Sequence, residues 1–410
     1  MSKRFFFLPI LLILFSTALA QQDGTEAMRR AAQLEAEGKF REAAAVLQDA
    51  RKRSAQPDFI KTLEFELDRL ERIKLDYSLT KEKLFELLSR AVQGLTPQEF
   101  ERWINEGKFD ARQIDGVTYY MSSSVSNLFF RYPEFAARRI DPPDEREFEA
   151  STLQAVRSIK RAAMESGTPY VLPKRFQNTM TVALKPGAVP AGETVRAWLP
   201  IPRSFPHQRG FKILSSSPAV KSLAPEDFPI RSAYFEQMVE QEKPTVFQIE
   251  YEYTAYGVWF DLKPERVEAY DPHDPAVRDF TKEGPHVVFT EKIRRLSNDL
   301  AGGETNPLIK AHKFYDWITE TIKYSYALEY STIRNISEYC LSQGYGDCGQ
   351  AALLFITLCR VNGIPARWQS GWLTIPGGKT IHDWTEIYLK PWGWVPVDPY
   401  MGVFAMQYFS

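Results

Sequence analysis

The spacing of hydrophobic residues changes near residue 170 of this 410-residue chain, and the change limits the folds that it can adopt. Between about residues 24 and 169, apolar side chains return every three or four positions, which is typical of amphipathic helices. From about 175 to 262 the chain has short alternating runs such as NTMTVAL and ETVRAWLPI, which indicate strands. We therefore predict an α+β fold, in which a β-sandwich-like unit follows a helical one.

The length of the chain predicts more than one folded domain. The piece AMRRAAQLEAEGKFREAAAVLQDARKRS resembles one tetratricopeptide-type hairpin broken near Gly38, and without a second copy it does not indicate a repeat array. The predicted segments are a signal peptide (1–20), a helical accessory region with this hairpin (21–169), a β-sandwich-like domain (170–262), a turn-rich linker (263–285) and a C-terminal domain (286–410).

The N-terminus has the order of a secretory signal. Lys3 and Arg4 precede an apolar run over residues 5–15, and small residues around Ala20 form a cleavage site. The run is shorter than the ~20 residues of a membrane-spanning helix. We expect cleavage after Ala20, no membrane anchor afterwards, and an exported protein in the periplasm or outside the cell.

Charge and cysteine content exclude several classes of protein. The 51 basic residues balance 52 acidic ones, so nothing predicts a nucleic-acid partner. The three cysteines, Cys340, Cys348 and Cys359, leave at least one thiol unbridged; a Cys340–Cys359 disulfide stays open, with burial favoured for Cys359. No CxxC, HxxxH or HExxH spacing occurs, so we predict neither a metal nor another cofactor.

One cysteine lies where a helix should begin. An apolar run over residues 351–361 ends at Asn-Gly, and Asp347 can cap its start with Gln350 three positions later. Cys348 then falls in the first turn, where unpaired N–H groups favour the thiolate, the form that attacks a carbonyl carbon. Gly346 and Gly349 are expected to leave room for a substrate backbone. Taken alone, such a cysteine is more often a small buried apolar residue.

A histidine and an aspartate follow on a predicted hairpin. The run IHDWTEIYL alternates as a strand with His382 and Glu386 on one face, and WVPVDP returns after a Lys-Pro-Trp-Gly turn to end at Asp398. Pairing should bring Asp398 beside His382, where a carboxylate can orient an imidazole that takes a proton from a thiol. Glu386 is either a hydrogen-bond acceptor near the site or part of a structural ion pair.

The motifs GDCGQ, ARWQSGW, HDWTE and GWVPVDP, in this order, resemble the transglutaminase-like superfamily, whose catalytic core is related to papain. The resemblance covers about residues 287–400, and the preceding β-unit is similar to the N-terminal β-domain of exported bacterial members. It implies Cys348 as nucleophile, His382 as base and Asp398 as the third catalytic member. It also implies a second oxyanion donor upstream of the nucleophile, for which Tyr324 and Tyr326 are candidates.

The implied reaction is thiol-dependent acyl transfer at an amide bond of a protein or peptide, including cell-wall peptides. Exported members imply hydrolysis, as by a cysteine peptidase or amidase. Two alternatives stay open: a protein-glutamine gamma-glutamyltransferase that crosslinks proteins, and an inactive exported binding or scaffold protein. A zinc site formed by the same three residues is a further, weaker alternative. The sequence does not set the oligomeric state.

Overall fold

The computed structural model describes residues 25–142, 146–373 and 380–407, so the predicted signal peptide lies outside the described residues. The chain folds into two compact units, each of which is discontinuous in sequence. Unit 1 contains Met1–Pro143, Glu283–Leu300 and Phe314–Val361, and unit 2 contains Asp144–Lys282, Ala301–Lys313 and Asn362–Ser410. Within the described ranges, every helix is too short or too polar to cross a membrane.

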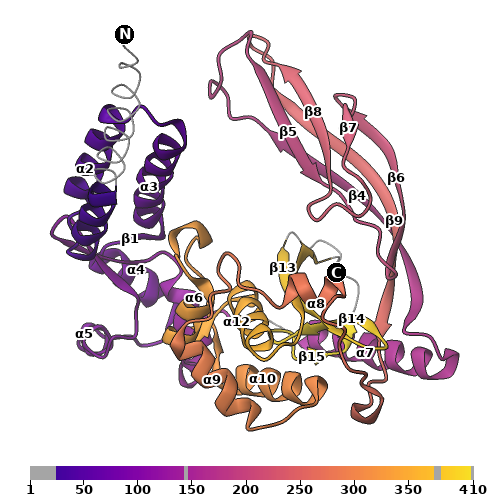
Figure 1. The fold of residues 1–410 in the computed structure, drawn as a ribbon. Helices are drawn as coiled ribbons and strands as arrows, with labels where there is room; N and C mark the ends of the chain where they lie inside the picture. The colour runs from indigo at the N-terminus through magenta and orange to yellow at the C-terminus, as the bar shows by residue number, and fades with distance from the viewer. Residues whose placement is uncertain (1–24, 143–145, 374–379, 408–410) are drawn as a thin grey trace, which may run out of the picture. The chain divides into compact units, whose positions relative to one another are not determined.

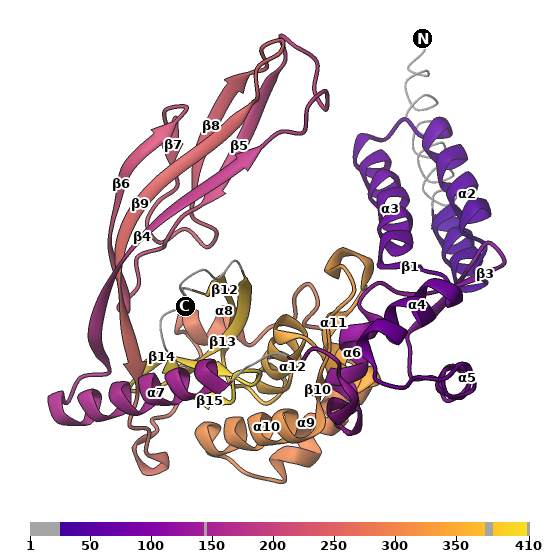
Figure 2. The same cartoon turned by 180° about the vertical axis from the view of Figure 1, so that it is seen from behind.

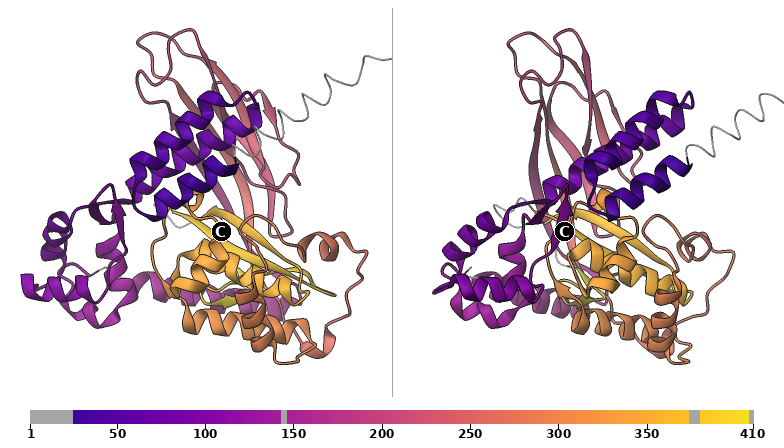
Figure 3. Two further views of the ribbon diagram at one scale, coloured as in Figure 1. Left: turned by 60° about the vertical axis from the view of Figure 1, so that its left-hand side comes forward. Right: turned by 90° about the vertical axis from the view of Figure 1, so that its left-hand side faces the viewer.

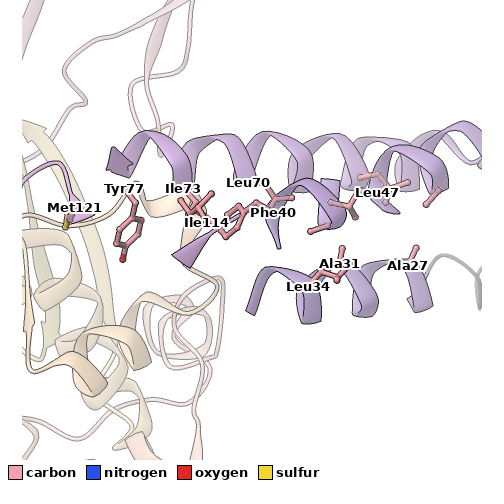
Figure 4. Packing of buried hydrophobic residues seen from close by; sticks show 13 residues of the cluster. Ala27, Ala31, Leu34, Phe40, Leu47, Leu70, Ile73, Tyr77, Ile114 and Met121 are labelled. Carbon is pink, nitrogen blue, oxygen red and sulfur yellow. The ribbon is translucent and has the colours of Figure 1, made fainter. Parts of the chain in front are cut away.

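Unit 1 begins with three amphipathic helices, formed by residues 25–36, α2 (Phe40–Arg53) and α3 (Pro57–Asp76) (Figure 3). The first two meet at Gly38, whose φ of +77° is unfavourable for other residues. A Cβ on Gly38 would also lie only 2.9 Å from the Cβ of Gln113. Apolar side chains from these helices, together with three from the neighbouring residues Tyr77, Ile114 and Met121, form one buried core (Figure 4): Ala27, Ala31, Leu34, Phe40, Ala43, Leu47, Ala50, Leu63, Leu70, Ile73, Tyr77, Ile114 and Met121.

A small antiparallel sheet lies within this region, where the sequence pattern predicted helices alone. Its strands β1 (Tyr77–Leu79), β2 (Ala111–Ile114) and β3 (Val117–Met121) have the order β1-β3-β2. Asp115 and Gly116 join β2 to β3 with φ values of 50° and 89°, as an Asp-Gly hairpin turn requires. Strands of three to five residues are too short for their alternation to be distinguished from the helical periodicity around them.

A second core of unit 1 packs around Phe100 and Trp103. Its helices are α4 (Lys81–Ala91), α5 (Pro97–Asn105), α6 (Ser124–Arg131) and η1 (Pro133–Arg138). The later part of the unit contains α9 (Glu291–Ala301), η3 (Tyr330–Thr332), α11 (Ile336–Gln343), α12 (Cys348–Val361) and the short strands β10 (Lys323–Tyr324) and β11 (Tyr345–Gly346). Helix α10 (Pro307–Thr321) contributes residues to both units.

Unit 2 contains a β-sandwich built from long strands (Figure 1). One sheet pairs β9 (Val246–Trp259) with β4 (Tyr170–Ala183), β6 (Gln208–Ser217) and β16 (Met406–Gln407). The other sheet has the order β5 (Thr194–Pro200), β8 (Ser232–Met238), β7 (Ser222–Leu223). Alternating side chains from both sheets share a core that includes Leu199, Phe235, Phe247 and Ile249. Helix α7 (Arg146–Ser166) contacts β4 and β9 through the buried Ile159.

A second sheet of unit 2 has the order β12 (Ala366–Trp372), β13 (Ile381–Leu389), β14 (Gly393–Asp398), β15 (Val403–Phe404). The residues after Asp398 therefore enter both sheets, β15 beside β14 and β16 beside β9. Between β9 and α9, the segment predicted as a linker contains two short helices, η2 (Pro264–Arg266) and α8 (Pro275–Phe280). The predicted α+β class, with helices and antiparallel sheets in separate stretches, is confirmed.

Candidate active site

Cys348 is the first residue of α12, as predicted. The Asp347 carboxylate accepts the backbone N–H of Gln350 at 3.0 Å, and the Asp347 carbonyl accepts that of Ala351 at 3.0 Å. The hydroxyl of Tyr330 donates to the same Asp347 oxygen at 2.5 Å. Asp347 thus caps the helix and leaves Cys348 in the turn where backbone N–H groups point toward the helix start.

Burial distinguishes Cys348 from the other two cysteines. Cys348 is partly exposed, whereas Cys340 and Cys359 are fully buried and no disulfide joins them. Burial raises the pKa of the Cys340 thiol to about 12, so that sulfur stays protonated at neutral pH. Cys348 is therefore the thiol that a substrate can reach.

Gly346 has a different role from the one expected. A Cβ at this position would lie 2.7 Å from Gln350 Oε1 and 3.1 Å from Cys340 Sγ. The space beside Gly346 is thus occupied by the protein itself. Glycine allows close packing of the turn on α12 and does not leave room for a substrate backbone, and the sequence interpretation was wrong on this point.

His382 and Asp398 meet across the β13–β14 hairpin. The register pairs Thr385 with Val397, which places Asp398 diagonally across from His382. The distance between His382 Nε2 and Asp398 Oδ2 is 2.5 Å, and the two side chains are only 4% and 10% exposed. The second carboxylate oxygen accepts the backbone N–H of Met401 at 3.0 Å. Since Nε2 faces the carboxylate, Nδ1 is the ring nitrogen through which His382 would exchange a proton.

Aromatic and apolar side chains enclose this pair. The rings of Trp384 and Tyr400 lie 6.1 Å and 5.8 Å from the imidazole. A cavity of about 10 Å³, the size of one water, adjoins the pair. It is lined by Leu373, His382, Trp384, Asp398, Met401, Val403, Met406 and Gln407. Low exposure to water strengthens the hydrogen bond between the imidazole and the carboxylate.

Glu386, on the same face of β13, belongs to a structural ion pair. Its carboxylate accepts from Arg367 Nε at 2.7 Å and from Gln369 Nε2 at 2.5 Å, both on the neighbouring strand β12. The Arg367 guanidinium in turn lies 3.9 Å from the ring of Trp394. Of the two roles open for Glu386, these contacts favour the structural one.

Tyr324 and Tyr326, the candidates for a second oxyanion donor, both pack edge-on against Phe130 at 4.9 and 5.4 Å. Their part in catalysis stays a prediction. Sequence reasoning missed Asp110, Asn127 and Arg131, which contact the strands around these tyrosines. They lie about 200 residues earlier in the chain, and no local motif marks them.

The structure brings His382 and Asp398 together within unit 2, and Cys348 lies in unit 1. A contact between Cys348 and His382 stays a prediction, as does the zinc alternative that would use all three residues. Within residues 25–142, 146–373 and 380–407, no three His, Cys, Asp or Glu side chains are grouped to hold a metal ion.

Comparison with known proteins gives a family match over this part of the chain. Residues 294–399 match the model of the transglutaminase-like superfamily. An uncharacterized protein of Haemophilus influenzae is 26% identical over an alignment of 148 residues that covers 30% of this chain and 39% of that protein. The chain thus spans about two fifths of the length of this relative.

Two solved structures are similar at low identity. One, named "putative cysteine protease", is from Cytophaga hutchinsonii (18% identity, TM-score 0.41, covering 56% of this chain and 80% of that one). The other is the periplasmic domain of TgpA from Pseudomonas aeruginosa (16% identity, TM-score 0.31, covering 52% and 71%). The family match covers the predicted nucleophile, base and third member alike, and the chain therefore contains a transglutaminase-like domain at residues 294–399.

Proposed function

We propose that this protein is a thiol-dependent enzyme that transfers the acyl group of an amide bond in a protein or peptide. Cys348 would act as nucleophile, His382 as general base and Asp398 as the residue that orients His382. The observation that carries the proposal is the buried hydrogen bond of 2.5 Å between His382 and Asp398, which lies inside a transglutaminase-like domain. The capped helix start at Cys348 supports it independently.

The reaction would have two halves. In the first, Nδ1 of His382 takes the Cys348 proton and the sulfur attacks the amide carbonyl carbon. Backbone N–H groups at the start of α12 would stabilise the negative oxygen. Collapse of this intermediate breaks the C–N bond, the leaving amine takes the proton from His382, and a thioester remains on Cys348. Asp398 stabilises the imidazolium during these steps.

In the second half, an acceptor attacks the thioester and restores the thiol. We propose water as this acceptor, so that the products are a carboxylic acid and an amine, as for a peptidase or amidase. The resemblance to exported bacterial members supports hydrolysis and a location outside the cytoplasm. Transfer to a lysine-type amine is the second candidate, because a thioester reacts with either nucleophile.

Selective alkylation tests the nucleophile without knowledge of the substrate. At about pH 6, iodoacetamide should modify Cys348 faster than Cys340 or Cys359, because the thiolate is the reactive form. His382→Ala should slow the alkylation of Cys348 at this pH, because the sulfur loses the base that takes its proton. His273→Ala, at an exposed histidine, is the matched control and should leave the rate of Cys348 alkylation unchanged. Equal rates at Cys348 and Cys359 in the native protein would reject the proposal.

Incubation with casein, with and without a fluorescent amine, then separates the outcomes. New peptide ends that disappear in Cys348→Ala indicate hydrolysis. Incorporation of the amine without new ends would reject hydrolysis in favour of crosslinking. If Cys348 is selectively alkylated and casein is unchanged in both mixtures, a panel of cell-wall peptides is the next substrate class to test.

A further inference from the structure

Two short paired strands lie next to the turn before Cys348, and the second of them leads directly into it. β10 and β11 form a parallel pair in which Lys323 lies opposite Tyr345, and the Ser325 N–H donates to the Gly346 carbonyl at 2.9 Å. Gly346 precedes Cys348 by two residues. The position of the nucleophile therefore depends on what holds these two strands.

Helix α6, from the N-terminal helical region, lies beside β10 (Figure 2). The side-chain amide of Asn127 makes both hydrogen bonds that a neighbouring strand would make to Tyr326. It accepts the Tyr326 N–H at 2.8 Å and donates to the Tyr326 carbonyl at 3.2 Å. Asn127 thus fixes the backbone at the end of β10 from a helix about 200 residues earlier in sequence.

Arg131, one turn later on α6, holds both strands at once. Its Nε donates to Ser325 Oγ at 2.9 Å, and its guanidinium lies 3.5 Å from the ring of Tyr345 on β11. A terminal nitrogen donates to Asp110 at 2.5 Å, and the Tyr345 hydroxyl donates to the other oxygen of the same carboxylate at 2.5 Å. Asp110 therefore joins the arginine to β11.

These groups are almost fully inaccessible to water: Asn127 is 3% exposed, Arg131 is 5% and Ser325 is 0%. Buried polar groups are costly when a partner is missing, so the set strongly favours one arrangement of its members. Asp110, Asn127 and Arg131 all lie outside residues 294–399, which match the superfamily model.

We propose that Asn127, Arg131 and Asp110 are positioning residues for the nucleophile, an inference that rests on the proposed function of Cys348. They hold β10 and β11 so that the turn at Gly346 and Asp347 presents Cys348 in its reactive place. The helical region is then a working part of the catalytic apparatus.

The test compares Asn127→Ala and Arg131→Lys with wild type in the full chain. A displacement of the nucleophile by about 1 Å can cost ~10²-fold in rate. We therefore expect kcat, normalised to the amount of Cys348 that can be alkylated, to fall about 10- to 100-fold in both variants. KM should stay within about twofold, and the pH midpoint of Cys348 alkylation should shift from that of wild type. Asn127→Asp, which retains the acceptor for the Tyr326 N–H, should recover part of kcat.

Arg138→Lys is the matched control. Arg138 makes a two-pronged pair with Glu99 at 2.7 and 2.9 Å in the same helical region, and within the described part of the chain its hydrogen bonds go to Gln93 and Glu99 and not to β10 or β11. It should keep the wild-type kcat and pH midpoint. Tyr345→Phe removes only the hydroxyl that donates to Asp110, and it serves as the test variant if Asn127→Ala and Arg131→Lys prevent folding. It should shift the pH midpoint of Cys348 alkylation in the same direction as those two variants.

Two failures are distinguishable. If wild type shows no selective alkylation of Cys348, the proposed function itself fails. If wild type is selective but Asn127→Ala, Arg131→Lys and Tyr345→Phe match Arg138→Lys in kcat per site and in pH midpoint, the positioning role is rejected and the function stands. A loss of folded protein with unchanged kcat per site would likewise assign these residues to stability alone.

Discussion

His382 and Asp398 are sixteen positions apart in sequence and are joined by a short hydrogen bond between adjacent strands. The strand alternation and the turn between them predicted this pairing, and it is confirmed. Two properties of the site depend on how side chains pack in three dimensions and could not be predicted: the small cavity beside the pair and the packing against Gly346. A single sequence does not show which remote side chain fills a given space.

Asp398→Ala should lower kcat/KM by about 10²- to 10⁴-fold, because His382 loses both its orientation and a partner for its positive charge. Asp398→Asn leaves one oxygen for two donors, the Met401 N–H and the His382 Nε2–H, and should lose a similar factor. Steady-state kinetics on the cleaved substrate measure both. A kcat/KM for Asp398→Ala within about threefold of wild type would show that the carboxylate has no part in catalysis.

Cys340 gives a prediction about thiol reactivity. Because burial raises its pKa to about 12 and its side chain has no exposed surface, it should react with a thiol reagent only after unfolding. In Cys348→Ala, titration with Ellman's reagent should detect almost no thiol in the native protein and two in urea. Rapid reaction of a thiol in native Cys348→Ala would contradict this burial.

At the scale of elements, a buried ion-pair network joins the first helix of unit 1 to its neighbours. Glu35 accepts from Arg69 on α3 and, at 2.6 Å, from Arg112 on β2. Burial would raise the pKa of Glu35, but the hydrogen bond and charge of Arg69 outweigh it and hold this pKa below its usual value. Periodicity predicted the helices, whereas charges paired over 34 and 77 positions leave no local pattern.

Arg69→Ala should destabilise unit 1 by about 1–3 kcal/mol at pH 7, since it leaves the partly buried Glu35 without its main partner. The sign of the pH effect follows from the lowered pKa. The stabilising contribution of the Arg69–Glu35 pair is fully present above the pKa that Glu35 has in the unfolded chain. It is lost as the pH falls through the lower pKa that Glu35 has in the folded protein. Urea unfolding followed by circular dichroism from pH 7 to 3 should show a stability gap between wild type and Arg69→Ala that closes toward acid. Arg29→Ala, at an exposed pair with Glu26, is the control and should change stability little at any pH.

For the whole molecule, the pattern of hydrophobic spacing was sufficient to predict the α+β class and the strand-rich stretch. It did not predict the path of the chain between the sheets. The predicted segments divide the sequence into consecutive blocks, and these boundaries stay a prediction. The two compact units combine distant stretches instead, and the residues of β16 join the sandwich. A two-residue strand carries no periodic signal, so its partner is set by tertiary packing alone.

Ending the chain after Gly402 should loosen the end of β9. This change removes β16 and the Ala405 carbonyl that accepts the Phe260 N–H at 3.0 Å. Hydrogen exchange at Phe260 should accelerate at least about tenfold, while Ile249 in the middle of β9 serves as an internal control and stays protected. Unchanged exchange at Phe260 would show that the β16 pairing does not protect this strand in solution.

The pairing of β16 with β9 also has a kinetic consequence. About 150 residues separate Met406 from its partner Trp259, so closing this contact carries a large loop entropy and belongs among the slow steps of folding. During synthesis, β9 has long left the ribosome before its last neighbour is made. Until then the end of β9 has an unpaired edge, which a chaperone can recognise while the chain is still incompletely folded.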